Sequence, residues 1–402
     1  MSKTKKDLLI MCQYFYPEKI TSALLPFMTA KYLSKNGITV DVLTGTPSNY
    51  LKHSNYRVPQ SETVEGVRIR RLNYLKLSKK NVLSRLVNYF SIVIAFLLKL
   101  PTMRQYKVIM VYSNPPILPL ISVIAKKLFN NKLVFVSYDV YPEIAIRTEV
   151  ISDNSIIARV MKIVNKFVFS SADKVVALSS EMKKFLVENR PISTEKIEII
   201  PNWSTENHYN SVTNNEVSDG IFRIGYFGNI GIAQDFDTVK KLILSKRNDL
   251  TLEWNFAGHG GLFEDFKRFI LENKIINVKV YDYLEESELN KLANICDAFL
   301  LSLKSELNGL AVPSKYYTYL NYRKPIIAII SNESDISKEI NQYNLGVAIE
   351  NDTKTDLIKI IKKLSISNRN INYVDIYNEF YESDVQLVKY SNMLHDLIVN
   401  TN

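Results

Sequence analysis

The fold is decided by residues 8–43, where the apolar run Leu8-Leu-Ile-Met-Cys-Gln13 is followed by a helical pattern and then by the run Ile38-Thr-Val-Asp-Val-Leu43. The first run is too short for a helix and predicts a strand. From Thr21 to Asn36 apolar residues recur at helical spacing, and Gly37 is a residue type that commonly ends helices. The second run is rich in β-branched residues and predicts another strand. A strand, a helix and a strand in this order predict a βαβ unit with parallel strands.

The same rhythm continues along the chain and restarts after a polar segment. Strand-like runs follow at residues 107–112, 132–137, 174–178 and 197–200. Residues 202–220 are polar and rich in turn formers, which predicts a linker. Further strand-like runs lie at 222–227, 251–256, 278–281, 298–301, 326–330 and 346–349. We therefore predict an α/β protein with two doubly wound domains, residues 1–203 and 204–376. A C-terminal helical segment, residues 377–402, could pack on either domain, and we expect it to pack back on the first.

The composition favours an intracellular globular protein. Its 402 residues, 46% of them hydrophobic, can bury two cores. Cys12 and Cys296 lie far apart and match no metal-binding spacing, which favours a reducing compartment. The N-terminal residues show no signal-peptide pattern, and no uncharged apolar run reaches the roughly 18 residues of a membrane span. We therefore expect a cytoplasmic protein.

Positive charge is concentrated in the first half of the chain. Residues 1–200 hold 30 Lys and Arg against 14 Asp and Glu, whereas the rest holds 21 against 27. Between Gly66 and Tyr138 there is no acidic residue, while thirteen Lys or Arg occur. This asymmetry predicts an anionic partner, either a membrane or a nucleic acid.

An apolar run inside this acid-free stretch favours a membrane over a nucleic acid as the anionic partner. It extends from Leu86 to Leu98 and is too short to span a bilayer. Basic residues surround it: Lys76, Lys79, Lys80, Arg85, Lys99, Arg104 and Lys107. Such a segment fits a helix lying on an anionic membrane surface, and the alternative is a buried helix with basic ends. We expect no nucleic-acid partner, because no reading motif for nucleic acid is present.

In open α/β sheets ligands bind beyond the carboxyl ends of the strands, so we sought site residues there. The first strand of the second half runs into Gly228, Asn229 and Gly231, where glycines let backbone amides approach an anion. The next strand ends near His259, and the third near Tyr283, where main-chain atoms could meet a nucleobase. A tight strand-to-helix turn is the alternative for the glycines, and a loop histidine without a function is the alternative for His259.

The stretch from Gly309 to Pro325 adds a cation to these strand ends. Pro313 can occupy the first turn of a helix, Ser314 can cap its free amides, and Lys315 would stand at its positive end. A helix start with an added cation suits a phosphate group. An ordinary loop-to-helix junction is the alternative, but the convergence of several such strand ends favours a site.

In the first half, the segment Asp139-Val-Tyr-Pro-Glu143 follows a predicted strand. Two carboxylates at this place could perform acid–base work on a substrate. The alternative is a helix-capping aspartate and a solvated glutamate.

Several motifs together resemble glycosyltransferase family 4, the retaining enzymes of the GT-B fold, and within it the capsule and O-antigen group that contains the L-fucosamine transferases. In the family's order they are Tyr14-Phe-Tyr-Pro17-Glu18, Pro47-Ser-Asn-Tyr50, Asp139–Glu143, Ile200-Pro-Asn202, Gly228–Gly231 and Pro313–Lys315. The resemblance covers nearly the whole chain.

The resemblance implies two Rossmann-like domains facing across a cleft. The second would hold a nucleotide sugar, usually linked to uridine diphosphate (UDP), and the first the acceptor. The implied reaction moves the sugar, with retention, to a lipid-linked saccharide in the synthesis of cell-surface polysaccharide, at the inner face of the cell membrane. Members of this type generally need no metal, and we expect neither a metal nor another cofactor.

The resemblance also assigns roles to residues. Lys315 and the amides around Asn229 would neutralise the diphosphate, and Glu306 would touch sugar hydroxyls. The implied catalytic residues are Asp139, Glu143 and Lys315. The implied donor-binding residues are Gly228, Asn229, Gly231, His259, Tyr283, Glu306, Gly309, Leu310, Ser314 and Thr318. The implied acceptor-binding residues are Tyr16, Glu18 and Asn49.

This chain departs from the family pattern at three places. Thr318 stands where the family often has a glutamate, and the Gly-Gly after the first Tyr-Pro is absent. The loop from Gly228 to Asp235 has no Arg or Lys, where many family members have one. Either Lys315 and a residue such as Arg323 supply this charge, or donor binding is weakened. Two alternative functions share the architecture: a nucleotide-sugar 2-epimerase, and a non-catalytic glycosyltransferase-like partner protein.

Overall fold

The computed structural model describes residues 5–47, 58–77, 82–205, 219–282, 284–352, 356–367 and 373–401. The chain forms two compact units. Unit 1 contains residues 1–205, 310–312 and 383–402, and unit 2 contains residues 206–309 and 313–382. Of the predicted linker, residues 202–205 belong to unit 1 and residues 206–218 lie outside the described residues.

The described part of unit 1 is built on an eight-stranded sheet with the order β3-β4-β2-β1-β5-β6-β7-β8. All neighbouring strands are parallel except β3 and β4. The strands are β1 (Lys6–Cys12), β2 (Val40–Gly45), β3 (Ser61–Val64), β4 (Val67–Leu72), β5 (Tyr106–Tyr112), β6 (Lys132–Val136), β7 (Lys174–Ala177) and β8 (Ile197–Ile199). The sequence predicted every parallel strand of this sheet except β4, and it also missed β3.

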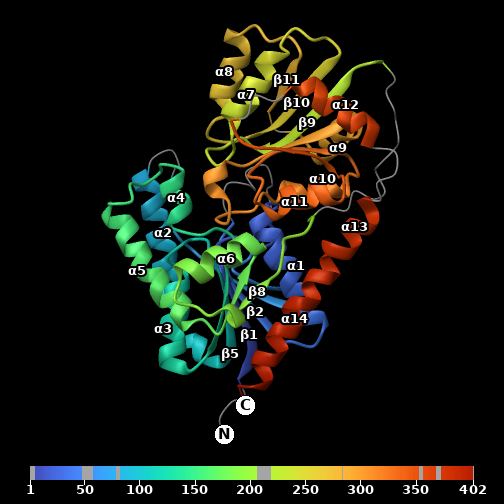
Figure 1. The fold of residues 1–402 in the computed structure, drawn as a ribbon. Helices are drawn as coiled ribbons and strands as arrows, with labels where there is room; N and C mark the ends of the chain where they lie inside the picture. Colours follow the sequence, from blue (N-terminus) through green and yellow to red (C-terminus); the bar gives the residue numbers. More distant parts are fainter. Residues whose placement is uncertain are drawn as a thin grey trace. The chain divides into compact units, whose positions relative to one another are not determined.

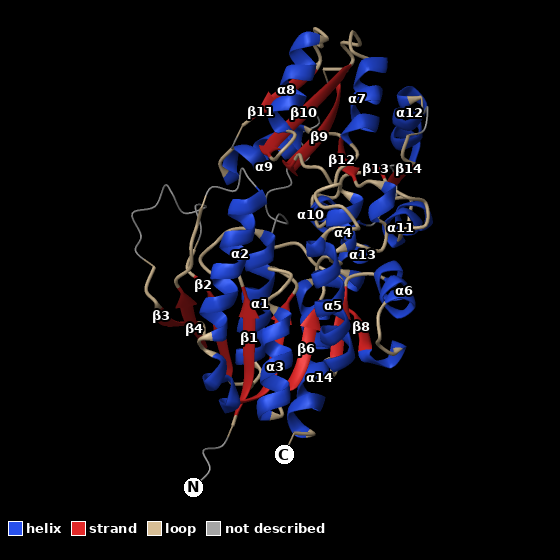
Figure 2. Cartoon of the chain, turned by 90° about the vertical axis from the view of Figure 1, so that its left-hand side faces the viewer, coloured by secondary structure: helices blue, strands red, loops and turns tan. Residues whose placement is uncertain are grey.

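Helices cover both faces of this sheet. On one side lie α1 (Thr21–Lys35) and α14 (Ser383–Val399), and on the other lie α2 (Val82–Leu97), α3 (Pro119–Phe129) and α5 (Ile156–Ser171) (Figure 1). Figure 2 is turned so that α2, α3 and α5 stand in front of the sheet. The remaining helices are α4 (Glu143–Arg147), α6 (Ser180–Asn189) and the 3₁₀ turns η2 (Leu100–Gln105) and η3 (Thr194–Lys196).

The described part of unit 2 is built on a six-stranded, fully parallel sheet with the order β11-β10-β9-β12-β13-β14. The strands are β9 (Phe222–Asn229), β10 (Leu252–His259), β11 (Val278–Tyr281), β12 (Ala298–Ser302), β13 (Ile326–Ile329) and β14 (Gly346–Ile349). The helices are α7 (Phe236–Ser245), α8 (Phe263–Glu272), α9 (Glu286–Ile295), η4 (Ser305–Leu307), α10 (Lys315–Asn321), α11 (Asp335–Gln342), α12 (Leu357–Ser367) and α13 (Tyr373–Phe380). The sequence predicted all six strands.

The predicted C-terminal helix is in fact two helices in different units. Its first part, α13, belongs to unit 2 and ends at Phe380. Tyr381 then donates a hydrogen bond to the Glu339 carboxylate, 2.5 Å away, which ties the chain to α11. The second part, α14, packs on unit 1: Tyr390 and Leu394 join its core, and the Tyr390 ring lies 6.5 Å from that of Trp203.

Candidate functional site

The ends of β9 and β10 pack backbone against backbone in unit 2. Gly228 pairs with Gly258, and Asn229 with His259. The Ile230 N–H donates a hydrogen bond of 2.6 Å to the His259 carbonyl. A Cβ atom on Gly258 would lie 1.9 Å from the Gly228 carbonyl oxygen, so only glycine fits there. These glycines therefore bring two strand-end turns together.

Lys315, the first residue of α10, lies across the first of these turns. Its Nζ donates hydrogen bonds to the Tyr226 hydroxyl at 3.2 Å and to the Asn229 carbonyl at 3.5 Å. The same Nζ is 4.7 Å from the centre of the Tyr226 ring. A Cβ on Gly228 would lie 2.7 Å from Lys315 Cε, so the glycine makes room for the lysine stem. The structure thus brings together three residues that the sequence named: Gly228, Asn229 and Lys315.

Burial lowers the pKa of Lys315 to about 8. Within the described part of unit 2, no carboxylate forms an ion pair with its ammonium group. A cation held by neutral acceptors and partly removed from water gains most from an anionic ligand.

The prediction that Ser314 caps α10 is wrong. Ser314 already has helical backbone angles, φ −58° and ψ −20°, and its side chain accepts no capping hydrogen bond. A capping side chain needs an extended backbone at that position. The helix is instead fixed by tyrosines, which the sequence analysis did not select. Tyr316 donates a 2.8 Å hydrogen bond to Glu339, and Tyr319 accepts one of 3.0 Å from the Phe227 N–H.

Three other proposed donor residues of unit 2 lie at the loop ends. His259 is exposed at the end of β10, and the Gly231 N–H donates a 2.9 Å hydrogen bond to Gln234. Glu306 is exposed in η4, where Ser305 donates a 3.3 Å hydrogen bond to its carboxylate. Their roles toward a ligand stay predictions.

The remaining donor candidates occupy varied places. Gly309 is buried and has a left-handed backbone, with φ +73°, which glycine adopts without strain. Thr318 is half-buried on α10. Leu310 belongs to unit 1, where its carbonyl accepts a 2.9 Å hydrogen bond from Val140. Tyr283 lies outside the described residues.

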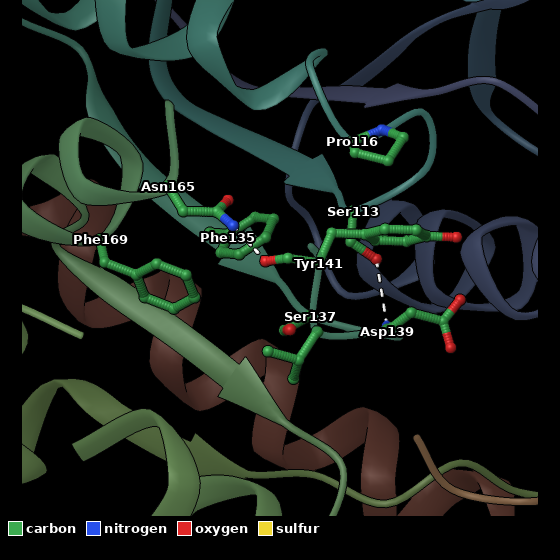
Figure 3. Close-up of a pocket in the computed structure, with 9 residues that line it drawn as sticks. Ser113, Pro116, Phe135, Ser137, Asp139, Tyr141, Asn165 and Phe169 are labelled. Carbon is green, nitrogen blue, oxygen red and sulfur yellow. Dashed lines mark hydrogen bonds between the residues drawn. The ribbon is translucent and has the colours of Figure 1, made fainter. Parts of the chain in front are cut away.

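Asp139 follows β6 in unit 1 and is held through its backbone. The Ser113 hydroxyl accepts a hydrogen bond of 3.1 Å from the Tyr138 N–H. It also accepts one of 3.3 Å from the Asp139 N–H (Figure 3). Asp139 also forms an antiparallel bridge with Ala311. A small cavity adjoins it, lined by Ser113, Pro116, Phe135, Ser137, Asp139, Val140, Tyr141, Asn165 and Phe169. Figure 3 shows the Asp139 carboxylate pointing away from Asn165 and Phe169.

Burial raises the pKa of Asp139 to about 6. Among the described residues, no side chain donates a hydrogen bond to its carboxylate. At neutral pH the group is therefore mostly a carboxylate that still lacks a donor, which suits it to accept a hydrogen bond from a substrate hydroxyl.

Glu143, the first residue of α4, has a different environment. Its carboxylate forms an ion pair with Arg190, the residue that follows α6. The same guanidinium donates a 3.3 Å hydrogen bond to the Tyr141 carbonyl and lies 5.7 Å from the Phe169 ring. Both partners are largely buried. Glu143 is therefore neither a free carboxylate nor the solvated one of the alternative interpretation.

The acceptor candidates follow β1, whose carboxyl end lies at the same edge of the parallel sheet as that of β6. The Tyr16 ring stacks on Phe27 with 4.9 Å between ring centres. Glu18 is buried, and its charge adds to the rise in the pKa of Tyr74 to about 12, of which burial is the main cause. Asn49 lies outside the described residues.

One Asp-x-Asp spacing, Asp235-Phe-Asp237, is present at the start of α7, but its first carboxylate is engaged. Asp235 accepts hydrogen bonds from the Thr238 N–H at 3.0 Å, from the Thr238 hydroxyl at 2.6 Å and from the Asn351 amide at 2.8 Å. Within the described residues, no group of three or more His, Cys, Asp or Glu side chains could hold a metal ion.

The predicted surface helix, α2, is half-buried. Asn88, Ile92 and Phe96 face the core, whereas Phe90 and Ile94 are exposed. One face of the helix is thus buried in unit 1, as the alternative expected, while the other face is exposed, and membrane contact stays a prediction. None of the helices in the described segments combines the length and the apolar character needed to cross a membrane.

Part of the chain is similar in sequence to known glycosyltransferases. The sequence model of Glycosyltransferase Family 4 matches residues 27–203. The chain is 27% identical over 252 residues to a probable glycosyltransferase, WbjE, of Pseudomonas aeruginosa, and this match spans 60% of the chain and 62% of that relative.

Solved structures share the fold. Anabaena HepE in complex with UDP and glucose has a TM-score of 0.66 at 13% identity, covering 97% of this chain and 99% of that one. WaaG, a glycosyltransferase involved in lipopolysaccharide biosynthesis, has a TM-score of 0.64 at 11% identity, covering 96% and 99%. At these identities the similarity establishes the fold, which is GT-B.

Proposed function

We propose that this chain, whose residues 27–203 match the sequence model of Glycosyltransferase Family 4, is a retaining glycosyltransferase that moves a sugar from a UDP-linked donor to a lipid-linked saccharide. The product would be a cell-surface polysaccharide such as a capsule or an O-antigen. The observation that carries the proposal is the ammonium group of Lys315, held over the Gly228–Asn229 turn by neutral acceptors.

The donor half of the proposal rests on the chemistry of the leaving group. When the bond between the sugar and the diphosphate breaks, negative charge builds on the phosphate oxygens, and a preorganised cation stabilises that charge. Lys315 Nζ would supply the cation in unit 2, and the turn at Gly228 and Asn229 would supply backbone amides. The complex of HepE with UDP supports a uridine nucleotide.

The acceptor half rests on Asp139 in unit 1. Its donor-free carboxylate would accept a hydrogen bond from the acceptor hydroxyl and orient the oxygen for attack. The new glycosidic bond would form on the face from which the diphosphate departs, and a phosphate oxygen would take the proton of the hydroxyl. In this scheme the proton and the leaving group are both accounted for by the diphosphate.

In this scheme Glu143 would have a supporting role. Its ion pair with Arg190 holds the start of α4, just beyond Asp139. A 2-epimerase would need an acid–base carboxylate pair, and the engagement of Glu143 by Arg190 disfavours that alternative.

We also propose that unit 1 rests on an anionic membrane at the inner face of the cell membrane. A lipid-linked acceptor places its saccharide at that surface. The acid-free stretch from Gly66 to Tyr138 and the exposed Phe90 and Ile94 of α2 support this location.

A panel of nucleotide sugars tests the proposal. Each is incubated with the protein and with a lipid-linked saccharide fraction, and released UDP is measured with and without acceptor. We expect acceptor-dependent release with one donor, and NMR of the product should show the donor's anomeric configuration. Release that does not depend on acceptor, or an inverted product, would contradict transfer with retention. Epimerised donor formed without acceptor would favour the epimerase.

A further inference from the structure

The outer face of α5 carries an apolar ridge, which we define as Ile156, Val160, Ile163 and Phe167. All four side chains are exposed, Ile156 by 79% and Ile163 by 57%. Their spacing of four, three and four residues aligns them along one narrow stripe of the helix. The opposite face is buried through Ala158, Met161, Val164 and Val168. The helix is thus apolar on two faces, and only one of them is covered by the described part of unit 1.

A row of basic residues borders this ridge. Arg159, Lys162 and Lys166 are exposed and, at 100° per residue, lie together on one side of the stripe. The helix contains no acidic residue. Asp153, just before the helix, forms an ion pair of 2.6 Å with Lys162. From α3, the Lys127 ammonium lies 5.5 Å from the centre of the Phe167 ring.

The neighbouring helices extend the same surface. The middle helix, α3, contacts both α5 and α2, and all three lie on one side of the sheet (Figure 1). Exposed apolar side chains continue at Leu128 on α3 and at Ile94 and Leu97 on α2. No acidic residue occurs in α2, α3 or α5.

We propose that α5 is a membrane-docking helix that lies in the plane of an anionic bilayer surface. The apolar ridge would enter the boundary between headgroups and acyl chains, while Arg159, Lys162 and Lys166 would contact lipid phosphates. Charge complementarity selects this occupant. A second copy of the chain would bring like charges together across a symmetric interface, whereas anionic lipids neutralise them.

The inference deepens the membrane partner of the proposed function and rests on it for its biological role. In the sequence, the acid-free apolar pattern indicates membrane contact for the segment around α2 and not for α5. With α5 included, the docking surface extends across three adjacent helices. It therefore fixes the orientation of unit 1 on the bilayer more firmly than one helix would.

Vesicle binding by the full-length chain tests the inference. The protein is sedimented with vesicles of phosphatidylcholine alone and of phosphatidylcholine with phosphatidylglycerol. Val160→Asp on the apolar ridge is compared with Val388→Asp on α14, which lies on the other side of the sheet. The two valines have similar exposure, 46% and 42%, so the substitutions are matched in chemistry and in their expected effect on folding.

We expect the parent and Val388→Asp to bind anionic vesicles alike, and Val160→Asp to bind at least about tenfold more weakly. The double variant Lys162→Gln with Lys166→Gln should lose about fivefold per charge on anionic vesicles and little on neutral ones. Ile163→Gln provides a second ridge variant without an added charge, should Val160→Asp fold poorly.

Equal binding by parent and ridge variants would overturn the inference, as would failure of the parent to bind anionic vesicles. A parent that is dimeric in analytical ultracentrifugation, with a monomeric Val160→Asp and no vesicle binding, would assign the ridge to self-association instead. Calorimetry with UDP is run on the same samples. If the protein binds vesicles but not UDP, α5 still docks on membranes but the proposed transferase function is wrong. If it binds UDP but not vesicles, only the proposed membrane docking by α5 is wrong.

Discussion

Asp139 in unit 1 and Lys315 in unit 2 both follow parallel strands, and burial shifts both toward their neutral forms. The pKa of Asp139 rises to about 6 and that of Lys315 falls to about 8. They differ in how they are held. Lys315 has three close partners, namely the ring and hydroxyl of Tyr226 and the carbonyl of Asn229, whereas the Asp139 carboxylate has no donor within the described residues.

Lys315 is therefore a charge held in position by its neighbours, whereas Asp139 is a charge still available to a ligand. The ammonium of Lys315 is fixed before a ligand arrives, which suits an ion that must stabilise charge at a defined point. The carboxylate of Asp139 keeps its acceptor capacity for a group that is not yet present. We therefore expect substitutions at Lys315 to change ligand affinity first, and substitutions at Asp139 to change turnover first.

The largest expected effect is that of Asp139→Asn on turnover. The amide keeps the size of the side chain but is a far weaker hydrogen-bond acceptor for the sugar hydroxyl, so kcat should fall about 100-fold or more. UDP affinity, measured by calorimetry, should stay at the parent value because the residue belongs to unit 1. A variant with unchanged kcat would show that Asp139 neither orients nor activates the acceptor.

Lys315→Ala should weaken UDP binding by about 10- to 100-fold, because a charged hydrogen-bond donor to phosphate is lost. Lys338→Ala is the matched control: Lys338 is an exposed lysine on α11 of the same unit. Lys315→Arg should retain part of the affinity, since the charge remains while the fit over Gly228 changes. Calorimetry measures all three variants. If Lys315→Ala binds UDP as tightly as the parent, Lys315 does not contribute to the donor site.

The fold was predictable because buried parallel strands appear in the sequence as short runs of β-branched residues. The two missed strands show where this signal fails. Arg68, Arg70 and Arg71 interrupt the apolar pattern of β4. The Arg71 side chain is nevertheless fully buried, with an ion pair of 2.6 Å to Glu62 and hydrogen bonds of 2.8 Å to the carbonyls of Pro59 and Tyr16. In the sequence pattern, a charged side chain that is buried with its partners looks the same as one exposed to solvent.

The candidate site was predictable where it depends on glycines and a cation, and not where it depends on aromatic partners. Gly228, Asn229 and Lys315 were named from strand ends and motif order. Tyr226 and Tyr319 were missed because a tyrosine in a buried strand or helix resembles core packing in a sequence. Their neighbours offered the available signal, since Tyr226 stands two residues before Gly228 and Tyr319 four residues after Lys315.

Glu143→Gln tests whether the two carboxylates that follow β6, Asp139 and Glu143, have different roles. Loss of the charge leaves Arg190 largely buried without its partner, so the free energy of unfolding should fall by about 1–3 kcal/mol while kcat changes little. Glu188→Gln on α6 is the control, because Glu188 is exposed and lies two residues from Arg190. Chemical denaturation measures the stabilities. A large loss of kcat with an unchanged free energy of unfolding would instead indicate that Glu143 takes part in catalysis.

The smallest expected effects are those of pH, and they test the comparison between Asp139 and Lys315 most directly. Asp139 acts as a carboxylate, so kcat/KM should fall as the pH drops below about 6. Lys315 acts as an ammonium ion, and its lowered pKa means that the charged form is lost as the pH rises above about 8, where UDP affinity should fall up to about tenfold per pH unit. Lys315→Arg should abolish the alkaline limb while leaving the acid limb in place, because arginine stays protonated. If the alkaline limb persists in Lys315→Arg, another group titrates there, and the contrast between a positioned lysine and an available aspartate no longer accounts for the pH profile.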